Sequence, residues 1–161
     1  MQQQEVFVQL IKENEGIIYK ITRAYARDRE DQKDLYQEVV YQLWKSFESF
    51  KGNSKRSTWL YRVALNTSLT YANRRSRKGI SIPLDFNILN RMDEQDGIME
   101  ERVTTLYSCI KELNVIEKGL ILLFLEGKSY EEIAEITGFT VTNVGTRLGR
   151  IKQKLKKKIN N

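Results

Sequence analysis

The stretch that most restricts how this chain can fold is Lys128–Lys154, KSYEEIAEITGFTVTNVGTRLGRIKQK. Ser129, followed three residues later by Glu132, forms a capping box that begins a helix. Gly138 stands where that helix must end, and Thr140 is placed to cap a second helix. The sequence therefore predicts a helix, a tight turn and a second helix.

The second of these helices has two contrasting sides. An apolar side repeats at 100° per residue and consists of Val141, Val144, Leu148, Ile151 and Leu155. The opposite side carries short hydrogen-bonding groups and cations, namely Thr142, Asn143, Thr146, Arg147, Arg150 and Lys154. Such a helix suits the major groove of DNA. An ordinary helical hairpin with a solvated face is the alternative, but the caps, the glycine, the apolar side and the charge all agree with DNA binding.

The composition favours an all-α fold. The 161 residues are enough for one domain or two small ones, and the single proline leaves long stretches of helical periodicity. No apolar run approaches the ~20 residues of a membrane span. The amphipathic, acid-containing N-terminus does not resemble a signal peptide. We therefore expect a cytoplasmic protein that does not insert into membranes.

Catalytic chemistry has little support in this sequence. The chain has one cysteine, Cys109, and no histidine, so neither a Cys/His zinc site nor a histidine-dependent triad is possible. Cys109 lies among apolar residues and is expected in the core. There is no glycine-rich phosphate loop, and carboxylate pairs such as Asp28 and Asp31 are better explained as helix caps. We expect no metal, no cofactor and no enzymatic activity.

The charge is distributed in three blocks. Residues 1–80 carry 15 basic and 9 acidic side chains, residues 81–102 carry 2 and 6, and residues 103–161 carry 10 and 6. Two basic blocks separated by an acidic strip suggest two nucleic-acid-facing domains, 1–80 and 103–161, joined by a flexible acidic linker over 81–102.

The N-terminal block begins with two predicted helices. Residues 4–27 have one amphipathic period, and a second helix follows, with Asp31 as its predicted cap. One face of this second helix is polar and carries Asp34, Gln37, Glu38, Tyr41 and Gln42. It is either a solvated face or a protein-docking face, since tyrosine among polar groups is common at interfaces.

A third helix is predicted over STWLYRVALNTSLTYANRRSRK, with Ser57 or Ser54 as its cap. Arg62, Asn66 and Asn73 form a polar strip, with Trp59 beside it. The helix ends in four cations that suit phosphate contacts, Arg74, Arg75, Arg77 and Lys78. An aromatic ring beside the strip is able to stack on an unpaired base, although a place in the core is an alternative for Trp59.

Two further helices precede the helix-turn-helix. One contains Val103, Leu106, Tyr107, Ile110 and Leu113. The other begins at a second capping box, Asn114 with Glu117, and ends at Gly127. Its predicted inner side is Ile116, Leu120, Leu123 and Phe124. Together with the helix-turn-helix they predict a four-helix C-terminal domain.

Three segments resemble the small bacterial sigma factors of the extracytoplasmic-function type, in that family's order. DQKDLYQEVVYQLWKSF resembles the helix that grips the clamp of core RNA polymerase, and STWLYRVALNTSLTYANRRSR resembles the promoter-melting helix. LEGKSYEEIAEITGFTVTNVGTRLGRIKQKL resembles the C-terminal helix-turn-helix. The chain departs from the family at Leu113-Asn114, where a Leu-Pro pair is usual, and at Gly145, where a basic residue is common.

The resemblance implies an alternative sigma factor with core RNA polymerase and promoter DNA as partners, and an anti-sigma factor as a further possible partner. It implies that the polar face of the second helix docks on polymerase. It implies that the 51–58 loop, Trp59, Arg62 and Asn66 capture a base of the minus-ten element, while Arg74, Arg75, Arg77 and Lys78 hold the DNA backbone. The outer side of the last helix would read the minus-thirty-five element.

Two other classes remain open from the residues alone. A stand-alone helix-turn-helix regulator would explain Lys128–Lys154 but would leave the segment from Trp59 to Lys78 unexplained. A helical enzyme acting on nucleic acids has no recognisable catalytic group in this sequence.

Overall fold

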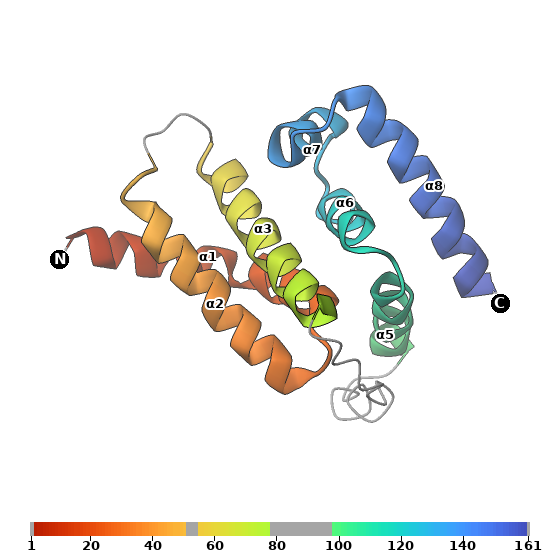
Figure 1. The fold of residues 1–161 in the computed structure, drawn as a ribbon, viewed down its shortest axis with the longest axis horizontal. Coiled ribbons are helices and arrows are strands. Elements are labelled where there is room, and N and C mark those ends of the chain that lie inside the picture. Colours follow the sequence, from red (N-terminus) through yellow and green to blue (C-terminus); the bar gives the residue numbers. More distant parts are fainter. Residues whose placement is uncertain (1, 51–54, 78–97, 161) are drawn as a thin grey trace.

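A computed structural model describes residues 2–50, 55–77 and 98–160, and all regular structure in these ranges is helical (Figure 1). The N-terminal group of helices comprises α1 (Gln2–Tyr25), α2 (Arg29–Phe47) and α3 (Arg56–Arg77). The C-terminal group comprises α5 (Ile98–Lys111), α6 (Val115–Leu125), α7 (Tyr130–Thr137) and α8 (Val141–Asn160). The predicted all-α fold, with a helix-turn-helix near its C-terminal end, is confirmed.

The N-terminal group packs all three of its helices against one another. Ile18 and Ile21 of α1 have no exposed surface, and neither do Leu35 and Leu43 of α2 or Leu60 of α3. These residues recur at helical spacing, so each helix presents one continuous apolar side to the others. On α3, Tyr61, Leu65 and Ala72 are buried together with Leu60 and Ala64.

The cap of α2 differs from the prediction. Asp28, not Asp31, is the N-cap, and its side chain accepts a hydrogen bond from the Asp31 amide. Asp31 lies within the first turn and is buried. Its carboxylate accepts from the Arg27 amide at 2.8 Å and from the Tyr71 hydroxyl. The two aspartates cap the helix reciprocally. Asp28 accepts from the Asp31 amide inside the helix, and Asp31 accepts from the Arg27 amide before it.

The start of α3 also differs from the prediction. The helix begins at Arg56, so Ser57 lies inside it and does not cap it; Ser54 lies outside the described residues. Thr58 and Trp59 are buried in its first turn. Trp59 packs against Phe47 and Phe50, with ring centroids 6.0 and 5.2 Å away. This aromatic contact fixes the N-terminal end of α3 on the end of α2.

Both predicted capping boxes of the C-terminal group are confirmed. Asn114 with Glu117 begins α6, and Ser129 with Glu132 begins α7. Gly138 ends α7 with φ of 85°, a backbone conformation that favours glycine. The predicted linker over 81–102 overlaps α5, because residues 98–102 are helical.

Two apolar residues predicted to face inward are exposed. Ile116 is 40% exposed and Val141 is 42% exposed. Both lie in the first turn of their helices, α6 and α8, where few neighbouring residues are available to cover a side chain. The remaining apolar positions of α8 are buried as predicted, from Val144 to Leu155.

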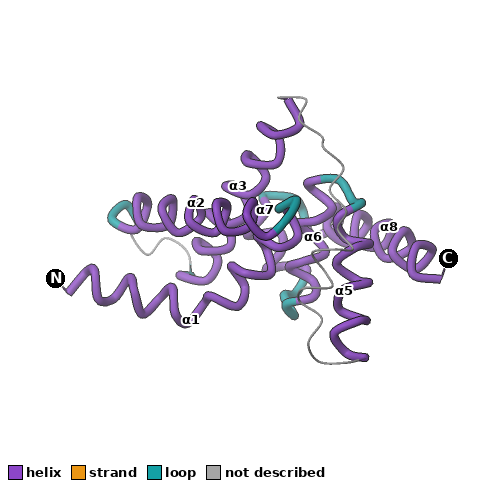
Figure 2. The backbone as a smooth tube through the Cα atoms, turned by 90° about the horizontal axis from the view of Figure 1, so that it is seen from below, coloured by secondary structure: helices purple, strands orange, loops and turns teal. Residues whose placement is uncertain are grey.

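The two groups of helices pack against each other and share one continuous core. The C-terminal end of α1 reaches the C-terminal group (Figure 2). Tyr25 is 1% exposed, and its hydroxyl donates a 2.5 Å hydrogen bond to the Val115 carbonyl of α6. Gly119 permits this approach, since a Cβ atom there would lie 3.2 Å from the Tyr25 oxygen. Burial raises the pKa of Tyr25, so its hydroxyl remains a donor.

Candidate functional site

The polar face predicted to dock a protein lies on the solvent side of α2. Asp34, Gln37 and Tyr41 are exposed, and Glu38 and Gln42 are half-buried. The Gln42 amide donates to the Glu38 carboxylate at 3.1 Å, which holds two of these polar groups in place. The five side chains follow one face because the opposite face of α2 is packed into the core. The structure therefore brings the predicted residues together as one exposed surface.

The strip on α3 is only partly as predicted. Arg62 and Asn66 are exposed and lie one helical turn apart. Trp59 does not join them, because it is 9% exposed and is held between Phe47 and Phe50. The structure thus places Trp59 in the core, the alternative that its aromatic character allowed, and gives it no free ring face for a base.

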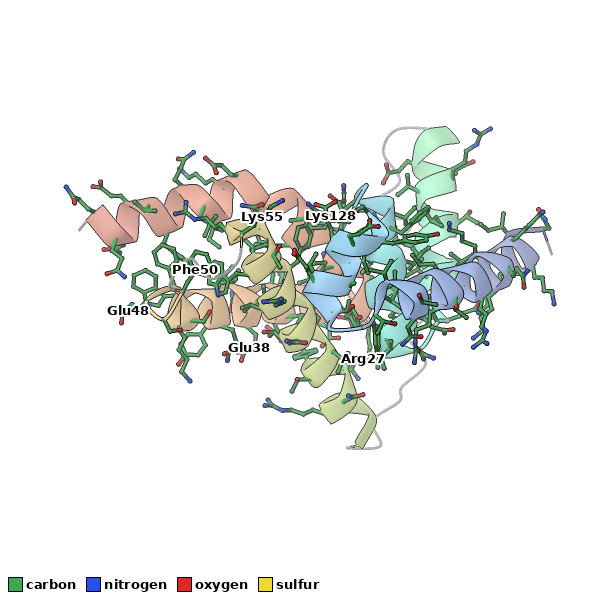
Figure 3. All side chains as sticks on the ribbon, turned by 90° about the horizontal axis from the view of Figure 1, so that it is seen from above. Arg27, Glu38, Glu48, Phe50, Lys55 and Lys128 are labelled. Carbon is green, nitrogen blue, oxygen red and sulfur yellow. The ribbon has the colours of Figure 1, made fainter. Side chains whose placement is uncertain are left out.

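Arg62 is engaged by the C-terminal group of helices. Its Nε and Nη2 atoms donate to the Glu135 carbonyl of α7 at 3.1 and 2.5 Å. Arg62 and Asn66 also line a groove of about 230 Å³ between α3, α6 and α7, together with Ile116 and Phe139. Lys128 lies just before α7, next to α3 (Figure 3). Its ammonium lies 4.9 Å from the centre of the Tyr61 ring on α3. The predicted base-binding strip therefore faces the other half of the chain.

The cations at the end of α3 are described only in part. Arg74 is exposed and lines a hollow of about 290 Å³ with Glu38, Gln42 and Asn66. Arg75 and Arg77 belong to α3, but their side chains are outside the described residues, as is Lys78. The same holds for residues 51–54 of the predicted loop. Arg74 is thus the cation that the structure links to both the strip and the polar face of α2.

The helix-turn-helix presents its predicted outer side to solvent. Thr140 caps α8, with its hydroxyl oxygen accepting from the Asn143 amide at 3.1 Å. Thr142, Thr146 and Arg150 are exposed. The Thr146 hydroxyl donates to the Thr142 carbonyl at 3.1 Å within the helix. These positions begin at the N-terminal end of α8, the part of a recognition helix that lies deepest in the major groove.

Two cations of this surface have partners within the chain. The Arg147 Nε atom donates to the Asn143 side-chain oxygen at 3.1 Å, and its guanidinium lies 4.7 Å from the centre of the Phe139 ring. The Lys154 ammonium lies 2.6 Å from Glu117, the capping-box residue of α6. Glu117 and Lys154 are far apart in the sequence, so their pair could not be predicted, whereas Phe139 at the turn could have been anticipated as a platform for a nearby cation.

Gly145 of α8, where the family usually has a basic residue, faces Tyr130 of α7. A Cβ atom at this glycine would lie 3.4 Å from the Tyr130 ring, which is ordinary van der Waals contact. The position therefore lies in the packing of α7 against α8, where the first carbon of a side chain would contact the tyrosine ring.

Other kinds of site find no support in the described parts of the chain. No group of three or more Cys, Asp or Glu side chains is placed to hold a metal ion there. None of the described helices is both long and apolar enough to cross a bilayer.

Comparison with known proteins assigns both halves of the chain. The family model for Sigma-70 region 2 matches residues 10–78, and the model for Sigma-70, region 4 matches residues 104–155. The first range covers the polar face of α2 and the strip on α3. The second covers the helix-turn-helix.

Similar proteins cover most of the chain. The ECF RNA polymerase sigma-E factor of Haemophilus influenzae is 29% identical over 143 residues, which is 81% of this chain and 76% of the relative. The sigma-E factor of Escherichia coli is also 29% identical, over 80% of this chain and 74% of its own length. RNA polymerase sigma factor SigV of Bacillus subtilis is 25% identical, over 90% of this chain and 86% of its own.

Two solved structures share the fold. The sigma factor RpoE of Bartonella quintana, in complex with the anti-sigma factor NepR, has a TM-score of 0.76 at 18% identity, covering 97% of this chain and 98% of that one. CnrH, in complex with the cytosolic domain of CnrY, has a TM-score of 0.69 at 22% identity, covering 98% and 89%. With both halves matched in order by sigma-70 regions and the fold shared, the chain belongs to the extracytoplasmic-function type of the sigma-70 family of RNA polymerase sigma factors.

Proposed function

We propose that this chain is an alternative sigma factor that binds core RNA polymerase in the cytoplasm and directs it to specific promoters, without catalysing a reaction itself. The observation that carries this proposal is the presence of two separate exposed surfaces in one chain. One is the polar face of α2, and the other is the outer side of α8. A stand-alone regulator would need only the second.

The division of labour follows the two family regions. We assign residues 1–80 to polymerase binding and minus-ten recognition, 81–102 to the linker and 103–161 to minus-thirty-five recognition. On α2, Asp34, Gln37, Glu38, Tyr41 and Gln42 dock on polymerase. On α3, Arg62 and Asn66 act on the minus-ten element, with Arg74, Arg75, Arg77 and Lys78 on the backbone. Trp59 supports them from the core and is not assigned to a base.

On α8, the roles divide along the helix. Thr142, Asn143 and Thr146 reach base edges, because the N-terminal part of a recognition helix enters the groove first. Arg147 reaches a base together with Asn143, to which it is hydrogen bonded. Arg150 meets a phosphate. Lys154 meets one only if it leaves Glu117, 2.6 Å away.

The arrangement of the two halves bears on this function. Arg62 is exposed but hydrogen bonded to α7, so its guanidinium becomes free for DNA only after the halves separate. Two of the structural neighbours were solved with an anti-sigma factor or with the cytosolic domain of a second protein. We propose that this chain also has an anti-sigma partner, which favours the closed arrangement.

The test is transcription from a library of promoters randomised at the minus-ten and minus-thirty-five elements, with this chain and core polymerase. Enrichment of specific sequences at both elements, dependent on the chain, is the expected result. If the chain instead bound a promoter duplex equally well without polymerase and enriched only one element, it would be a stand-alone regulator.

A further inference from the structure

A phenylalanine in the turn of the helix-turn-helix contacts the arginine that we assign to a base. Phe139 lies between α7 and α8, and the Arg147 guanidinium carbon lies 4.7 Å from the centre of its ring. The Arg147 Nε atom also donates to the Asn143 side-chain oxygen at 3.1 Å. From Val141 to Gly149 the helix contains no cation other than Arg147. Base recognition by a cation in the N-terminal part of α8 therefore depends on this one side chain.

The ring of Phe139 is held in place by both the turn and the core. Gly138 before it has the φ of 85° that favours glycine, and Thr140 after it caps α8. The Phe139 amide donates to the Thr137 hydroxyl oxygen at 3.3 Å. The ring is partly buried and packs against the core. Because its backbone is fixed on both sides, the ring is a platform with little freedom of its own.

The platform restricts Arg147 before DNA arrives. Arginine is among the side chains that lose the most rotamer freedom when they become ordered. In α8 the guanidinium is restrained twice, by the ring of Phe139 and by the hydrogen bond to Asn143. A side chain that is already ordered loses less entropy when it binds than a mobile one does. The ring is therefore able to favour base recognition without touching the base.

The hydrogen bond to Asn143 also decides which atoms remain for DNA. It uses Nε of Arg147 and the acceptor oxygen of Asn143. The atoms that remain are Nη1 and Nη2 of Arg147 and the amide nitrogen of Asn143, and all of them are donors. Nη1 and Nη2 have no hydrogen-bond partner within the described residues. In the major groove guanine presents two adjacent acceptors, O6 and N7, whereas adenine and cytosine each present an amino donor. The free pair of donors on Arg147 therefore matches guanine.

We propose that Phe139 is a positioning residue for Arg147, and that the stacked arginine reads a guanine of the minus-thirty-five element through Nη1 and Nη2. The identity of this DNA element rests on the proposed function, whereas the contact between ring and arginine does not. The alternative is a direct contact between the Phe139 ring and a thymine methyl group, which phenylalanine is also able to make. A direct contact predicts an effect of the ring that does not depend on Arg147.

The test is base selection by variants of the full chain. The promoter library randomised at both elements is presented to each variant with core polymerase. In a second arm it is presented to the chain alone at low salt, where phosphate contacts are strongest. Phe139→Leu keeps an apolar side chain and removes the ring, whereas Phe139→Tyr keeps the ring. Phe139→Leu is also combined with Arg147→Ala, and circular dichroism shows that every variant is folded.

Phe124→Leu is the matched control. The Lys152 ammonium of α8 lies 3.9 Å from the centre of the Phe124 ring of α6. The same substitution therefore removes the same kind of contact, between a ring and a cation of the same helix. Lys152 follows the N-terminal part of α8 that we assign to base edges, so losing its ring should not change the base preference.

We expect one position of the element to favour guanine in the parent chain. This preference should fall by at least about fivefold in Arg147→Ala, as loss of a bidentate base contact predicts. Phe139→Leu should lower it by about two- to fivefold, the amount that a cation–π contact supplies at an exposed site. Phe139→Tyr and Phe124→Leu should keep it. In the Arg147→Ala background, Phe139→Leu should have no further effect, because the two residues act as one unit.

Three results would overturn the proposal. They are the absence from both arms of a guanine preference that depends on Arg147, an unchanged preference in Phe139→Leu, and an equal effect of Phe139→Leu with and without Arg147. The two arms separate this failure from that of the proposed function. Polymerase-dependent selection at both elements together with any of these results would remove the positioning role and leave the sigma-factor role intact. Guanine selection by the chain alone, weakened in Phe139→Leu and without any polymerase-dependent selection, would support the positioning role and count against the proposed function.

Discussion

Removing one hydroxyl group should loosen the contact between the two halves. Tyr25→Phe deletes the hydrogen bond from α1 to the Val115 carbonyl of α6 and leaves the packed ring in place. A typical intramolecular hydrogen bond contributes about 0.5–1.5 kcal/mol net. The Gly119 amide also hydrogen bonds to this hydroxyl. Because Val115 and Gly119 are four residues apart in α6, the helical bond between this carbonyl and this amide is available to both groups after the substitution, and the loss should lie in this range. That free energy is a shift of about two- to twelvefold toward the open arrangement.

The measurement is single-molecule energy transfer between dyes on the two halves. Exposed Glu13 and Lys156 are replaced with cysteine for labelling, and the native Cys109 is buried. The fraction of molecules with low transfer should rise in Tyr25→Phe. Tyr41→Phe is the control, because Tyr41 is 54% exposed on α2, on the side away from this contact.

A low-transfer fraction that is the same in the parent and in Tyr25→Phe would show that the buried hydrogen bond does not hold the halves together. An equal rise of the low-transfer fraction in Tyr41→Phe would mean that the effect does not come from the hydrogen bond between Tyr25 and Val115. Either outcome would refute the reasoning, even if the chain remained fully folded.

Three further predictions concern the surfaces. Replacing both Asp34 and Glu38 with Arg should leave the fold intact and weaken capture of core polymerase in a pull-down by several kcal/mol, since like charges would meet at the interface; normal capture by the folded variant would remove this face from the interface. Asn143→Ala should relax base preference at one position of a randomised minus-thirty-five element, by about 1–3 kcal/mol. Arg150→Ala should instead weaken binding to all DNA sequences equally and lower the salt dependence of binding. If Arg150→Ala changed the base preference and Asn143→Ala did not, α8 would dock on DNA in a different way. The pH dependence of stability gives one more prediction, at Glu117. Burial raises the pKa of Glu117, but hydrogen bonds from Lys154 and from the Asn114 amide lower it, and the pKa is lowered overall. Its contribution to stability is therefore complete above the ordinary value of about 4.3 and is lost as the pH falls through the lowered pKa. The measurement is the free energy of unfolding in urea between pH 3 and 6. It should fall with pH in the parent chain, and the part of this fall that is due to Glu117 should be absent from Glu117→Gln.

Local signals in the sequence predicted much of this fold. Ser129 with Glu132 and Asn114 with Glu117 are pairs whose two hydrogen bonds form within one turn, so they do not depend on the rest of the molecule. Gly138 ends its helix for a similarly local reason. The cap of α2 was assigned to Asp31 instead of Asp28 because both are acids before an apolar helix, and only the burial of Asp31 against Tyr71 distinguishes them.

The contact between the halves could not be predicted in this way. Tyr25 and Val115 are 90 residues apart, and the amphipathic period over residues 4–27 does not indicate a contact with the C-terminal group. A helical pattern tells which side of a helix is buried and not which helix covers it. The acidic linker also favoured separate domains, and its charge contains no information about whether the halves touch.

Trp59 and Arg62 show the same limit at the candidate site. The aromatic ring was expected beside the polar strip because of its position on α3, but the ends of α2 and α3 meet and cover it. Arg62 was correctly expected on the surface. Its partner, the Glu135 carbonyl, is a backbone group. Because every residue has a backbone carbonyl, the sequence does not indicate which one accepts this bond.

Several cations assigned to DNA are hydrogen bonded within the chain, and the location of their partners decides how DNA would gain access to them. Lys154 pairs with Glu117 inside the C-terminal group, and the lysine side chain is itself 53% exposed, so a phosphate has only to compete with one carboxylate for it. Arg62 bonds across the two groups. DNA cannot replace the Glu135 carbonyl while α7 lies against α3, because the competitor must enter the space that the helix occupies. Lys154 therefore becomes available to DNA by a local exchange of partners, whereas the Arg62 guanidinium becomes available only when the halves separate. Any factor that changes the closed fraction should alter minus-ten recognition and leave binding to an isolated minus-thirty-five element unchanged.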